Sequence, residues 1–577
     1  MTHYRKNTGP GLRSRFSLLE VLTGPLSANK YHEVIVVVCS SYPCKQDLAV
    51  IKDNAVASSF SHVHSYPYSL LARQIPQRLS FVASLNLPDK PVLPDDLTMT
   101  RESIFLTALI GFLSLSSLAQ SSSSCGPAPS GAIKPSVASG FHVQVVATGL
   151  SKPRGLLIDN AGNLLVVEQG RGVVSAHTLN ENGGCISVGS SVDVTSRLSL
   201  NHGIELSNDG KTLYASSAEA VYSWSYDESA RTLSNQARVV ANMTTNDHTT
   251  RTLLLSQEAP GMLVVTRGST SNIDIDAANL DSGHSQVKAF NLTTRAGVYD
   301  FDVDGLRLGW GLRNDVGVAE HPGSGGIYTV ENSADELTRM GVDIHEDNPA
   351  EELNFLGYLN GKAYTPQGGN FGYPWCFSAW GVDDLPDNGK LTVGSQYAVD
   401  ASPDSNNQNK TDAYCAQQEP ARLVFQAHMA PLDIKFNNSG TEAWVTFHGS
   451  WDRTQPVGYK VSVVSFNKDG EPVDSLESKD AARDVLTNQD NSKCPADCFR
   501  PAAMAFDSQG RLYVSSDASG EIYLITRAPG AKLPGPTPTS SSTSTSTATN
   551  VAGSMGPAWS SGAGQLSFLS MLLALLL

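Results

Sequence analysis

The chain has 577 residues, of which 40% are hydrophobic and 17% are charged, and these values are ordinary for a globular protein. Its formal net charge of -15 argues against a nucleic-acid partner, because the chain has no basic stripe that could displace counterions from phosphates. The length leaves room for several domains or for one large propeller.

The first 98 residues differ from the rest, because they carry no repeat and precede a second methionine with a better leader. Residues 99–119 combine a charged Arg101, an apolar stretch and small residues before a cleavage point, as a secretory signal peptide does. We therefore expect residues 1–98 to be a gene-model extension or a disordered arm. The alternative is a cytosolic arm before a single-pass anchor, although the apolar stretch is short for a membrane span.

The other end of the chain also points to the secretory route. We expect a linker at residues 120–139, an ordered domain at 140–528 and a Ser/Thr/Pro-rich stalk at 529–554. Residues 555–577 end in an uncharged apolar tail that resembles the signal for a GPI anchor, and the alternative is a disordered tail. The expected location is extracellular, with a lipid anchor to the plasma membrane or cell wall.

Six of the eight cysteines follow the predicted leader, and an even number in an oxidising compartment implies disulfide bonds. Six cysteines allow fifteen pairings. The easiest choice is a local Cys494–Cys498 pair, which leaves Cys376–Cys415 and Cys125–Cys185. Four sequons, which fit a glycosylated surface, occur at Asn242, Asn291, Asn409 and Asn437.

One pattern recurs six times: an apolar strand, a tight turn with Asp, Asn or Gly, and a second apolar strand. The copies cover residues 155–169, 203–217, 252–268, 316–332, 432–449 and 503–517. The first three are about 50 residues apart, which is blade spacing. We predict an all-β fold, a six-bladed β-propeller with four-stranded blades and disordered termini. A series of sandwiches could also contain hairpins but would not repeat one hairpin at this spacing.

A long stretch without clear periodicity separates the fourth and fifth copies, at residues 335–429. An insertion of this length in a propeller often forms a binding loop or lid. Its most distinctive piece is the Gly- and aromatic-rich segment GGNFGYPWCFSAW at residues 368–380.

Arginine recurs beside these hairpins, where the loops of a propeller meet. If the register holds, the guanidinium groups converge on the axis and imply a polyanionic ligand, because the planar fork of Arg binds carboxylates in bidentate fashion. The arginines of these loops are Arg154, Arg251, Arg313, Arg453 and Arg500.

Five motifs, in this order, carry a family resemblance: DHTTR at 247–251, GLRNDVG at 311–317, ENSADE at 331–336, NFGYPW at 370–375 and HGSWDR at 448–453. Together they resemble the soluble quinoprotein glucose/sorbosone dehydrogenases, most closely the fungal PQQ-dependent pyranose dehydrogenases. The resemblance implies pyrroloquinoline quinone (PQQ), a planar ortho-quinone with three carboxylates, and that agrees with the ligand inferred from the arginines. It also implies oxidation of a pyranose at C1 to a lactone. Because the chain has no CxxCH haem motif, we expect a separate electron acceptor such as a cytochrome.

By this resemblance, His248 is the general base that takes the proton of the sugar hydroxyl, and Asp247 could orient it. The alternative is a loop histidine that caps a turn. Arg313 and Asn314 match the contacts of the family to the cofactor. The remaining candidates for the cofactor carboxylates are Arg154, Arg251, Arg453 and Arg500, with Lys435 a weaker one.

The resemblance also implies a Ca²⁺ ion that polarises the quinone and is bound by backbone carbonyls, here those of Ser333 and Ala334. The bacterial glucose enzymes carry Gly-Pro at this place, so the sequence departs from them there. We interpret Asp335 as a surface acid. Tyr373 and Trp375 are candidates for stacking on the sugar, with packing as the equal alternative.

Two other functional classes remain open at this stage. One is a calcium-dependent lactonase or esterase on a six-bladed propeller, which needs acidic metal ligands but no ring of arginines. The other is a non-catalytic surface propeller that binds glycans, since fold alone does not determine function.

Overall fold

The computed structural model describes residues 129–244, 247–294, 297–400 and 410–535, together with three short strands near the N-terminus. These strands, β1 (Val21–Leu22), β2 (Val34–Cys39) and β3 (Gln46–Ile51), form an antiparallel sheet within a unit of residues 1–118. The predicted signal peptide, most of the stalk and the anchor signal lie outside the described residues. No helix in the described part of the chain is long and apolar enough to cross a membrane.

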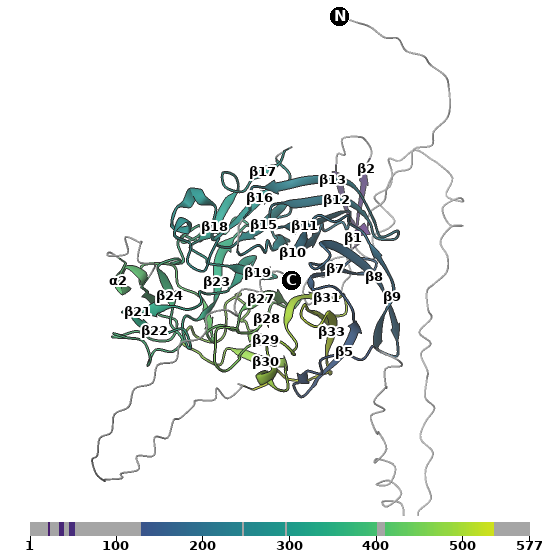
Figure 1. Cartoon of the computed structure of the whole chain (residues 1–577). Coiled ribbons are helices and arrows are strands. Elements are labelled where there is room, and N and C mark those ends of the chain that lie inside the picture. Colours follow the sequence, from purple (N-terminus) through teal and green to yellow (C-terminus); the bar gives the residue numbers. More distant parts are fainter. Residues whose placement is uncertain are drawn as a thin grey trace, which may run out of the picture. The chain divides into compact units, whose positions relative to one another are not determined.

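Six sheets, antiparallel except for the pairing of β13 with β17, form the blades of the second unit, and each contains one predicted hairpin repeat (Figure 1). The first blade consists of β6 (Pro153–Ile158), β7 (Leu164–Glu168), β8 (Val173–Asn182) and β9 (Cys185–Asp193). The second consists of β10 (Leu200–Leu206), β11 (Thr212–Ser217), β12 (Val221–Asp227) and β13 (Thr232–Ala241), extended by β17 (Tyr299–Asp300). The third consists of β14 (Leu253–Leu255), β15 (Met262–Arg267), β16 (Gln286–Asn291) and β18 (Leu306–Trp310).

The last three blades follow the same order from the axis outward. The fourth blade consists of β19 (Asp315–Glu320), β20 (Gly326–Glu331), β23 (Glu351–Tyr358) and β26 (Leu423–Phe425). The fifth consists of β27 (Pro431–Phe436), β28 (Glu442–Phe447), β29 (Lys460–Ser465), β30 (Ala482–Thr487) and β4 (Ser136–Val137). The sixth consists of β31 (Pro501–Phe506), β32 (Leu512–Ser516), β33 (Glu521–Arg527) and β5 (Phe141–Ala147). The prediction of a six-bladed, largely four-stranded propeller is confirmed.

The ring is closed by the start of the domain, because β5 pairs with β33 and so completes the last blade. Strands β10, β19, β27 and β31 lie nearest the axis, and β5, β9, β13 and β30 lie outside (Figure 1). This closure pairs the edge of β33 that would otherwise be exposed in the last blade.

The hydrophobic core lies between neighbouring blades rather than in one central cluster. Leu165 and Val167 of β7, for example, pack with Leu213 of β11 and Trp224 of β12. Burying each such side chain contributes about 1.5–3 kcal/mol, so blade-to-blade packing is the main source of stability.

Glycines allow the inner strands to approach one another closely. A Cβ atom on Gly155 would lie 1.9 Å from the carbonyl oxygen of His202, and one on Gly203 would lie 2.2 Å from that of Arg251. The first three blades therefore meet near the axis at the starts of β6, β10 and β14, where the predicted site residues lie.

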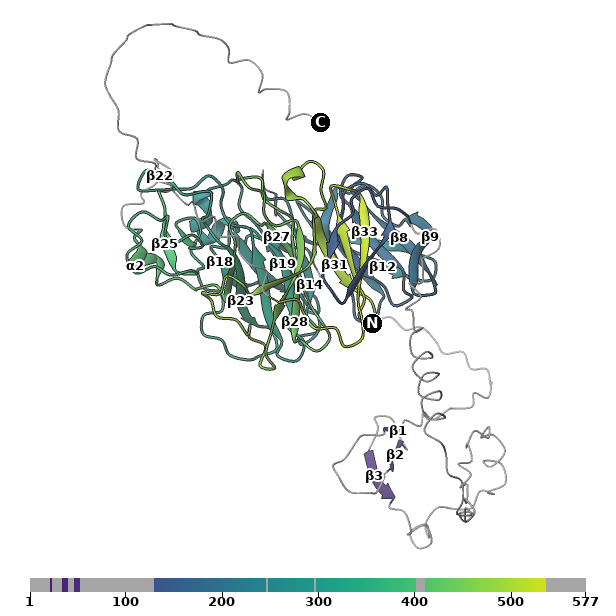
Figure 2. The same ribbon diagram turned by 90° about the horizontal axis from the view of Figure 1, so that it is seen from below.

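The stretch predicted as an insertion, residues 335–429, is more regular than the sequence pattern indicates, and it includes β23 and β26, the outer strands of the fourth blade. It contains the hairpins β21 (Thr338–Arg339) with β22 (Val342–Asp343) and β24 (Cys376–Ser378) with β25 (Gln396–Ala398), and the short helix α2 (Asp412–Cys415). It has a small core of its own around Phe377 and Tyr397. Figure 2 shows β25 and α2 beyond β18 and β23. Single-turn 3-10 helices occur elsewhere, at η1 (Ile275–Ala278), η2 (Leu280–Ser282) and η4 (Asn491–Lys493).

Two of the three predicted disulfide bonds are present. Cys376 pairs with Cys415, which fastens β24 to α2, and Cys494 pairs with Cys498 in a local loop. Cys185 is also disulfide-bonded. Its predicted partner Cys125 lies outside the described residues, so that pairing stays a prediction.

Candidate functional site

The inner strands of the blades bring the predicted polar residues to one mouth of the propeller. Arg154 and Asn201 are the second residues of β6 and β10. Arg313 lies two residues before β19, and Arg500 immediately precedes β31. A contact between neighbouring blades brings two of these loops together: the Asn201 side chain donates a hydrogen bond of 2.7 Å to the carbonyl oxygen of Thr249.

His248 lies partly buried at this mouth, and its ring is held on one side by Ser269. Its Nδ1 atom lies 2.8 Å from Oγ and 3.2 Å from the carbonyl oxygen of Ser269. The Ser269 hydroxyl donates its single proton to the carbonyl oxygen of Ser271, so it must accept from the imidazole. Nδ1 therefore carries the hydrogen, and the lone pair that can take a proton is on Nε2.

The imidazole of His248 is neutral at ordinary pH. Burial and the nearby Arg313 guanidinium lower its pKa from the usual 6.5 to about 3. A neutral imidazole is the form that can act as a base. Asp247, which was predicted to orient it, is exposed at the surface of the same loop.

Gly268 brings His248 and Asn314 together. A Cβ atom at this position would lie 2.5 Å from the side-chain oxygen of Asn314 and 2.8 Å from Cβ of His248. The absence of a side chain thus creates a narrow space where β15 ends, with a base on one side and an amide on the other. Asn314 is 7% exposed, so its amide is nearly buried at this place.

Arg313 ties three loops together beside His248. Its guanidinium group donates to the backbone carbonyl of Asn272 at 3.1 Å and to the carbonyl of Ser333 at 2.6 Å. Its ion pair with Asp335 is longer, at 3.4 Å. Most of its partners are neutral, so its positive charge is only partly compensated.

Arg251, another predicted cofactor contact, is completely buried and holds its own loop together. It donates to the carbonyl oxygens of His248 at 2.8 Å, Thr250 at 2.6 Å and Met243 at 2.6 Å. Burial and the nearby Arg267 lower its pKa to about 9. The structure places this guanidinium beneath the site, where it supports the backbone that carries His248.

On the opposite side of the mouth, one carboxylate organises the Asp517 cluster, which consists of Arg154, His202, His448, Arg500 and Asp517. Asp517 accepts 2.8 Å hydrogen bonds from Arg154 and from Nε2 of His448. Arg500 donates to Nδ1 of His448 at 2.9 Å, and Arg154 donates to Nδ1 of His202 at 3.2 Å. Burial is the main cause that lowers the pKa of both histidines, so two guanidinium charges face one carboxylate.

Lys435 lies deeper, near the axis. Its ammonium group is 3.2 Å from Asp433, and Lys435 shares the lining of a small cavity with His202 and Leu253. Burial opposes its charge, but Asp433 and Glu205 raise its pKa. The lysine is therefore a charged group below the mouth with carboxylate partners of its own.

Arg453 contacts the insertion. It pairs with Asp347 at 3.0 Å and with Glu346 at 3.5 Å, and it donates to the carbonyl oxygen of Glu346. These partners come from the turn after β22. The structure thus places Arg453 where the insertion meets the fifth blade.

The predicted calcium ligands lie beside Arg313. The carbonyl oxygen of Ser333 accepts the 2.6 Å hydrogen bond from that residue, and the Ser333 amide donates to Glu351 at 2.8 Å. The side chain of Ala334 packs into the core of the insertion. Hydrogen bonds therefore hold the backbone of Ser333 in place, and core packing holds that of Ala334.

Tyr373 and Trp375 are both buried. The Tyr373 hydroxyl accepts from the amide of Asp274 at 2.6 Å and donates to the carbonyl of Asn272 at 3.1 Å, while Trp375 packs on the Cys376–Cys415 disulfide. Among the described tryptophans the exposed one is Trp451, at 63%. It belongs to the HGSWDR motif, and the sequence analysis gave it no role of its own.

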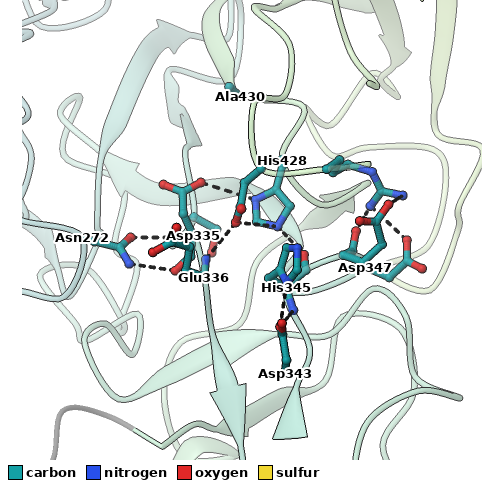
Figure 3. A network of polar contacts seen from close by, with 12 residues as sticks. Asn272, Asp335, Glu336, Asp343, His345, Asp347, His428 and Ala430 are labelled. Carbon is teal, nitrogen blue, oxygen red and sulfur yellow. Dashed lines mark hydrogen bonds and ion pairs between the residues drawn. The ribbon is translucent and has the colours of Figure 1, made fainter. Parts of the chain in front are cut away.

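Sequence reasoning also missed a polar network at the edge of the insertion (Figure 3). Asp335, His428 and Asp452 each contribute one atom to a group in which all atoms lie within 4.8 Å of one another. Asp335 starts the insertion, His428 ends it, and Asp452 follows β28. The three residues are far apart in sequence, so no local pattern could have grouped them.

Comparison with known proteins assigns the chain to a family. The family model described as TrAA12-like matches residues 135–528. A PQQ-dependent sugar dehydrogenase of Hypocrea jecorina is 46% identical over 402 residues, which cover 68% of this chain and 90% of that protein. A PQQ-dependent pyranose dehydrogenase of Coprinopsis cinerea is 39% identical over 425 residues and covers 70% of this chain, and this chain spans only 56% of its length.

A solved structure agrees with this assignment. The calcium structure of the Trichoderma reesei enzyme of carbohydrate-active family AA12 superposes with a TM-score of 0.65 at 47% identity, covering 68% of this chain and 97% of that one. The fold and the ordered motifs define a six-bladed propeller enzyme, and the chain belongs to the TrAA12-like family.

Proposed function

We propose that this chain is a PQQ-dependent dehydrogenase that oxidises the C1 hydroxyl of a pyranose sugar to a lactone. The names of its relatives and the order of its motifs support this proposal. The observation that carries it is the neutral imidazole of His248, which lies beside the partly compensated Arg313 and across Gly268 from Asn314.

The residues at the mouth fit a cofactor with several carboxylates. In the Asp517 cluster Arg154 pairs with the one carboxylate and Arg500 donates to His448, and Arg313 adds a further cation. This excess of positive charge favours a polyanion. We assign Arg154, Arg313, Asn314 and Arg500 to the cofactor, with Lys435 as a more remote positive charge. When bound, PQQ supplies the acceptor for the two electrons and the hydrogen that leave the sugar carbon.

A calcium ion is part of the proposal. The backbone carbonyls of Ser333 and Ala334 are the type of ligand that Ca²⁺ prefers. The Ser333 oxygen already accepts a hydrogen bond from Arg313, and its second lone pair leaves room for a metal. The ion would act as a Lewis acid beside the Arg313 charge.

His248 performs the proton transfer. Nε2 takes the proton of the C1 hydroxyl while Ser269 holds Nδ1–H, so the ring keeps its tautomer and orientation. A bound polyanion next to Arg313 would offset the charge of that residue, and we expect it to raise the pKa of His248 towards a value better suited to a base.

Reconstitution with PQQ and Ca²⁺ followed by a panel of pyranoses tests the proposal. We expect sugar-dependent reduction of a dye acceptor and formation of the lactone. Hydrolysis of esters or lactones without dye reduction would instead show a lactonase, and sugar binding without turnover would show a glycan-binding propeller.

The proposal includes a separate electron acceptor such as a cytochrome, and an extracellular enzyme on a lipid anchor. The two described disulfides fit an oxidising compartment. We expect a phosphatidylinositol-specific phospholipase C to release the enzyme from intact cells. Enzyme that stays bound after this treatment, or that is found only in the cytosol, would contradict the anchor.

A further inference from the structure

The network at the edge of the insertion has a geometry that hydrogen bonding does not explain. His428 Nδ1 lies 3.6 Å from an oxygen of Asp335, and Nε2 lies 3.8 Å from an oxygen of Asp452. Both separations exceed the range of about 2.7–3.2 Å for a hydrogen bond of this kind. The Nδ1–Asp335 separation matches the spacing between ligands of a tetrahedral metal, which is roughly 3.3–3.6 Å for bonds near 2.0–2.2 Å, whereas the Nε2–Asp452 separation is longer than this spacing.

Outer contacts fix the imidazole of His428 in the tautomer that a metal ligand needs. Nε2 donates to the carbonyl oxygen of His345 at 2.5 Å, so the lone pair is on Nδ1, which faces Asp335 (Figure 3). Histidines that bind metals characteristically donate their other ring N–H to a carbonyl or carboxylate.

Hydrogen bonds also hold the carboxylate of Asp452 and the backbone of Asp335. Asp452 accepts from the amide of Glu336 at 2.8 Å. The backbone of Asp335 is clamped by Asn272, whose side chain accepts from the Asp335 amide at 2.9 Å and donates to its carbonyl at 2.7 Å. His428 and Asp452 are 5% and 8% exposed, and Asp335 is half-buried, with 22% of its side chain exposed.

From these contacts we propose that Asp335, His428 and Asp452 form a site for a divalent transition-metal ion of the Zn²⁺ type. An imidazole among the ligands favours such an ion over Ca²⁺, which prefers oxygen ligands. The site is distinct from the backbone carbonyls assigned to calcium. Water fills the remaining coordination position.

The positions of the ligands in the chain indicate what the metal does. Asp335 and His428 are the two ends of the insertion, and Asp452 belongs to the loop after β28. One ion therefore fastens both ends of the insertion to the fifth blade. Because Asp335 also contacts Arg313, the ion fixes one wall of the mouth.

The competing explanation is a protonated His428 that serves as the cation between the two carboxylates. Burial disfavours this form, whereas Asp335 and Glu351 favour it and raise the pKa of His428. The two explanations differ in what the protein binds, so a metal titration separates them.

The test uses the full chain, stripped of metals by a chelator and then titrated with Zn²⁺ in excess Ca²⁺ by calorimetry. We expect one equivalent of Zn²⁺ in the wild type. The variants Asp452→Asn and His428→Asn should bind at least tenfold more weakly. The matched control is His284→Asn, which removes another histidine facing an aspartate, Asp274 at 2.9 Å.

Thermal unfolding gives a second readout. At a hundredfold excess of Zn²⁺ over its Kd, the midpoint should rise by about 3 °C in the wild type and the control, but not in the two ligand variants. If the wild type takes up no stoichiometric Zn²⁺, or the ligand variants bind it as well as the control, the proposal is wrong.

A spectroscopic measurement on the wild type keeps the test decisive if a ligand variant does not fold. Pulsed EPR of the Mn²⁺-loaded protein should detect coupling to one imidazole nitrogen. A spectrum without nitrogen coupling would overturn the site. None of these measurements depends on sugar oxidation, so failure here leaves the proposed dehydrogenase activity to its own test.

Discussion

The charged groups on the two sides of the propeller mouth differ in how far their charges are compensated by partners of opposite sign. On the His248 side, Arg313 donates mainly to neutral carbonyls, and its uncompensated charge acts together with burial to keep the imidazole neutral. On the other side, Asp517 binds both Arg154 and His448 directly. Burial opposes the charge of Asp517, yet these partners hold its pKa far below the usual range.

This difference separates two tasks that the site has to perform. A base needs a neutral ring with one nitrogen held and the other available. A group that binds a polyanion needs cations whose positions are fixed before the ligand arrives, and a buried carboxylate fixes them. The following four predictions test this division, from the largest expected effect to the smallest.

Replacement of the base should have the largest effect. His248→Ala removes Nε2 and should lower kcat by about 10²- to 10⁴-fold, with little change in cofactor affinity. Steady-state dye reduction gives kcat, and a fluorescence titration gives the affinity for PQQ. If the variant oxidises sugar at the full rate, the division of tasks is wrong.

The second prediction compares two arginines that looked alike in sequence. Arg313→Lys keeps the charge but loses the fork that holds Asn272 and Ser333, so PQQ affinity should fall by roughly 10- to 100-fold. Arg453→Lys disturbs only contacts to Glu346 and Asp347 and should change that affinity less than threefold. Equal losses in the two variants would contradict the assignment.

The third prediction concerns stability on the other side. Asp517→Asn leaves Arg154 without its buried partner and should destabilise the protein by about 3 kcal/mol at pH 7. Because the folded pKa of Asp517 is lowered, its stabilising effect is complete above the unfolded pKa of about 3.9 and is lost as pH falls towards the folded pKa.

Urea denaturation at several pH values measures this difference. The gap between wild type and Asp517→Asn should be constant from about pH 5 to 7 and should narrow below about pH 4. A gap that widens on acidification would show that Asp517 is protonated in the folded protein, contrary to the contacts seen.

The smallest effect should come from the exposed indole. Trp451→Ala should raise KM for the sugar a few-fold and leave kcat and the unfolding midpoint nearly unchanged, because Trp451 is 63% exposed and its neighbour Ser450 is held by Val457. Parallel kinetics on Trp375→Phe provide the contrast, since Trp375 is buried on a disulfide. A larger KM effect in Trp375→Phe would contradict this prediction, because the buried indole rather than the exposed one would then affect sugar binding.

Much of the fold could be predicted because its signals are local. Each blade contains a hairpin whose turn residues tolerate a positive φ, such as Gly210 at 70° and Gly510 at 76°, and six copies of one hairpin leave few architectures. The pairing of β5 with β33 has no such signal, because its partners are more than 370 residues apart. The regular elements of the insertion also escaped prediction, since their strands are only two or three residues long.

The candidate site divides in the same way. The motifs placed His248, Arg313 and Asn314 in the same neighbourhood, because each directly precedes a blade hairpin. They could not show that Arg251 lies under the loop rather than in the mouth, which depends on where the carbonyl of Met243 lies. Nor could they show that Asp335 meets His428, since 93 residues of insertion separate the two in the chain.

The sequence by itself determined the number of blades, the residues that each loop carries and the family to which the chain belongs. Only the tertiary structure decided which charged side chains pair with one another and which form hydrogen bonds to the backbone. The physical reason is that periodicity and turn chemistry depend on neighbours in the chain, whereas burial and the distance between charges depend on neighbours in space.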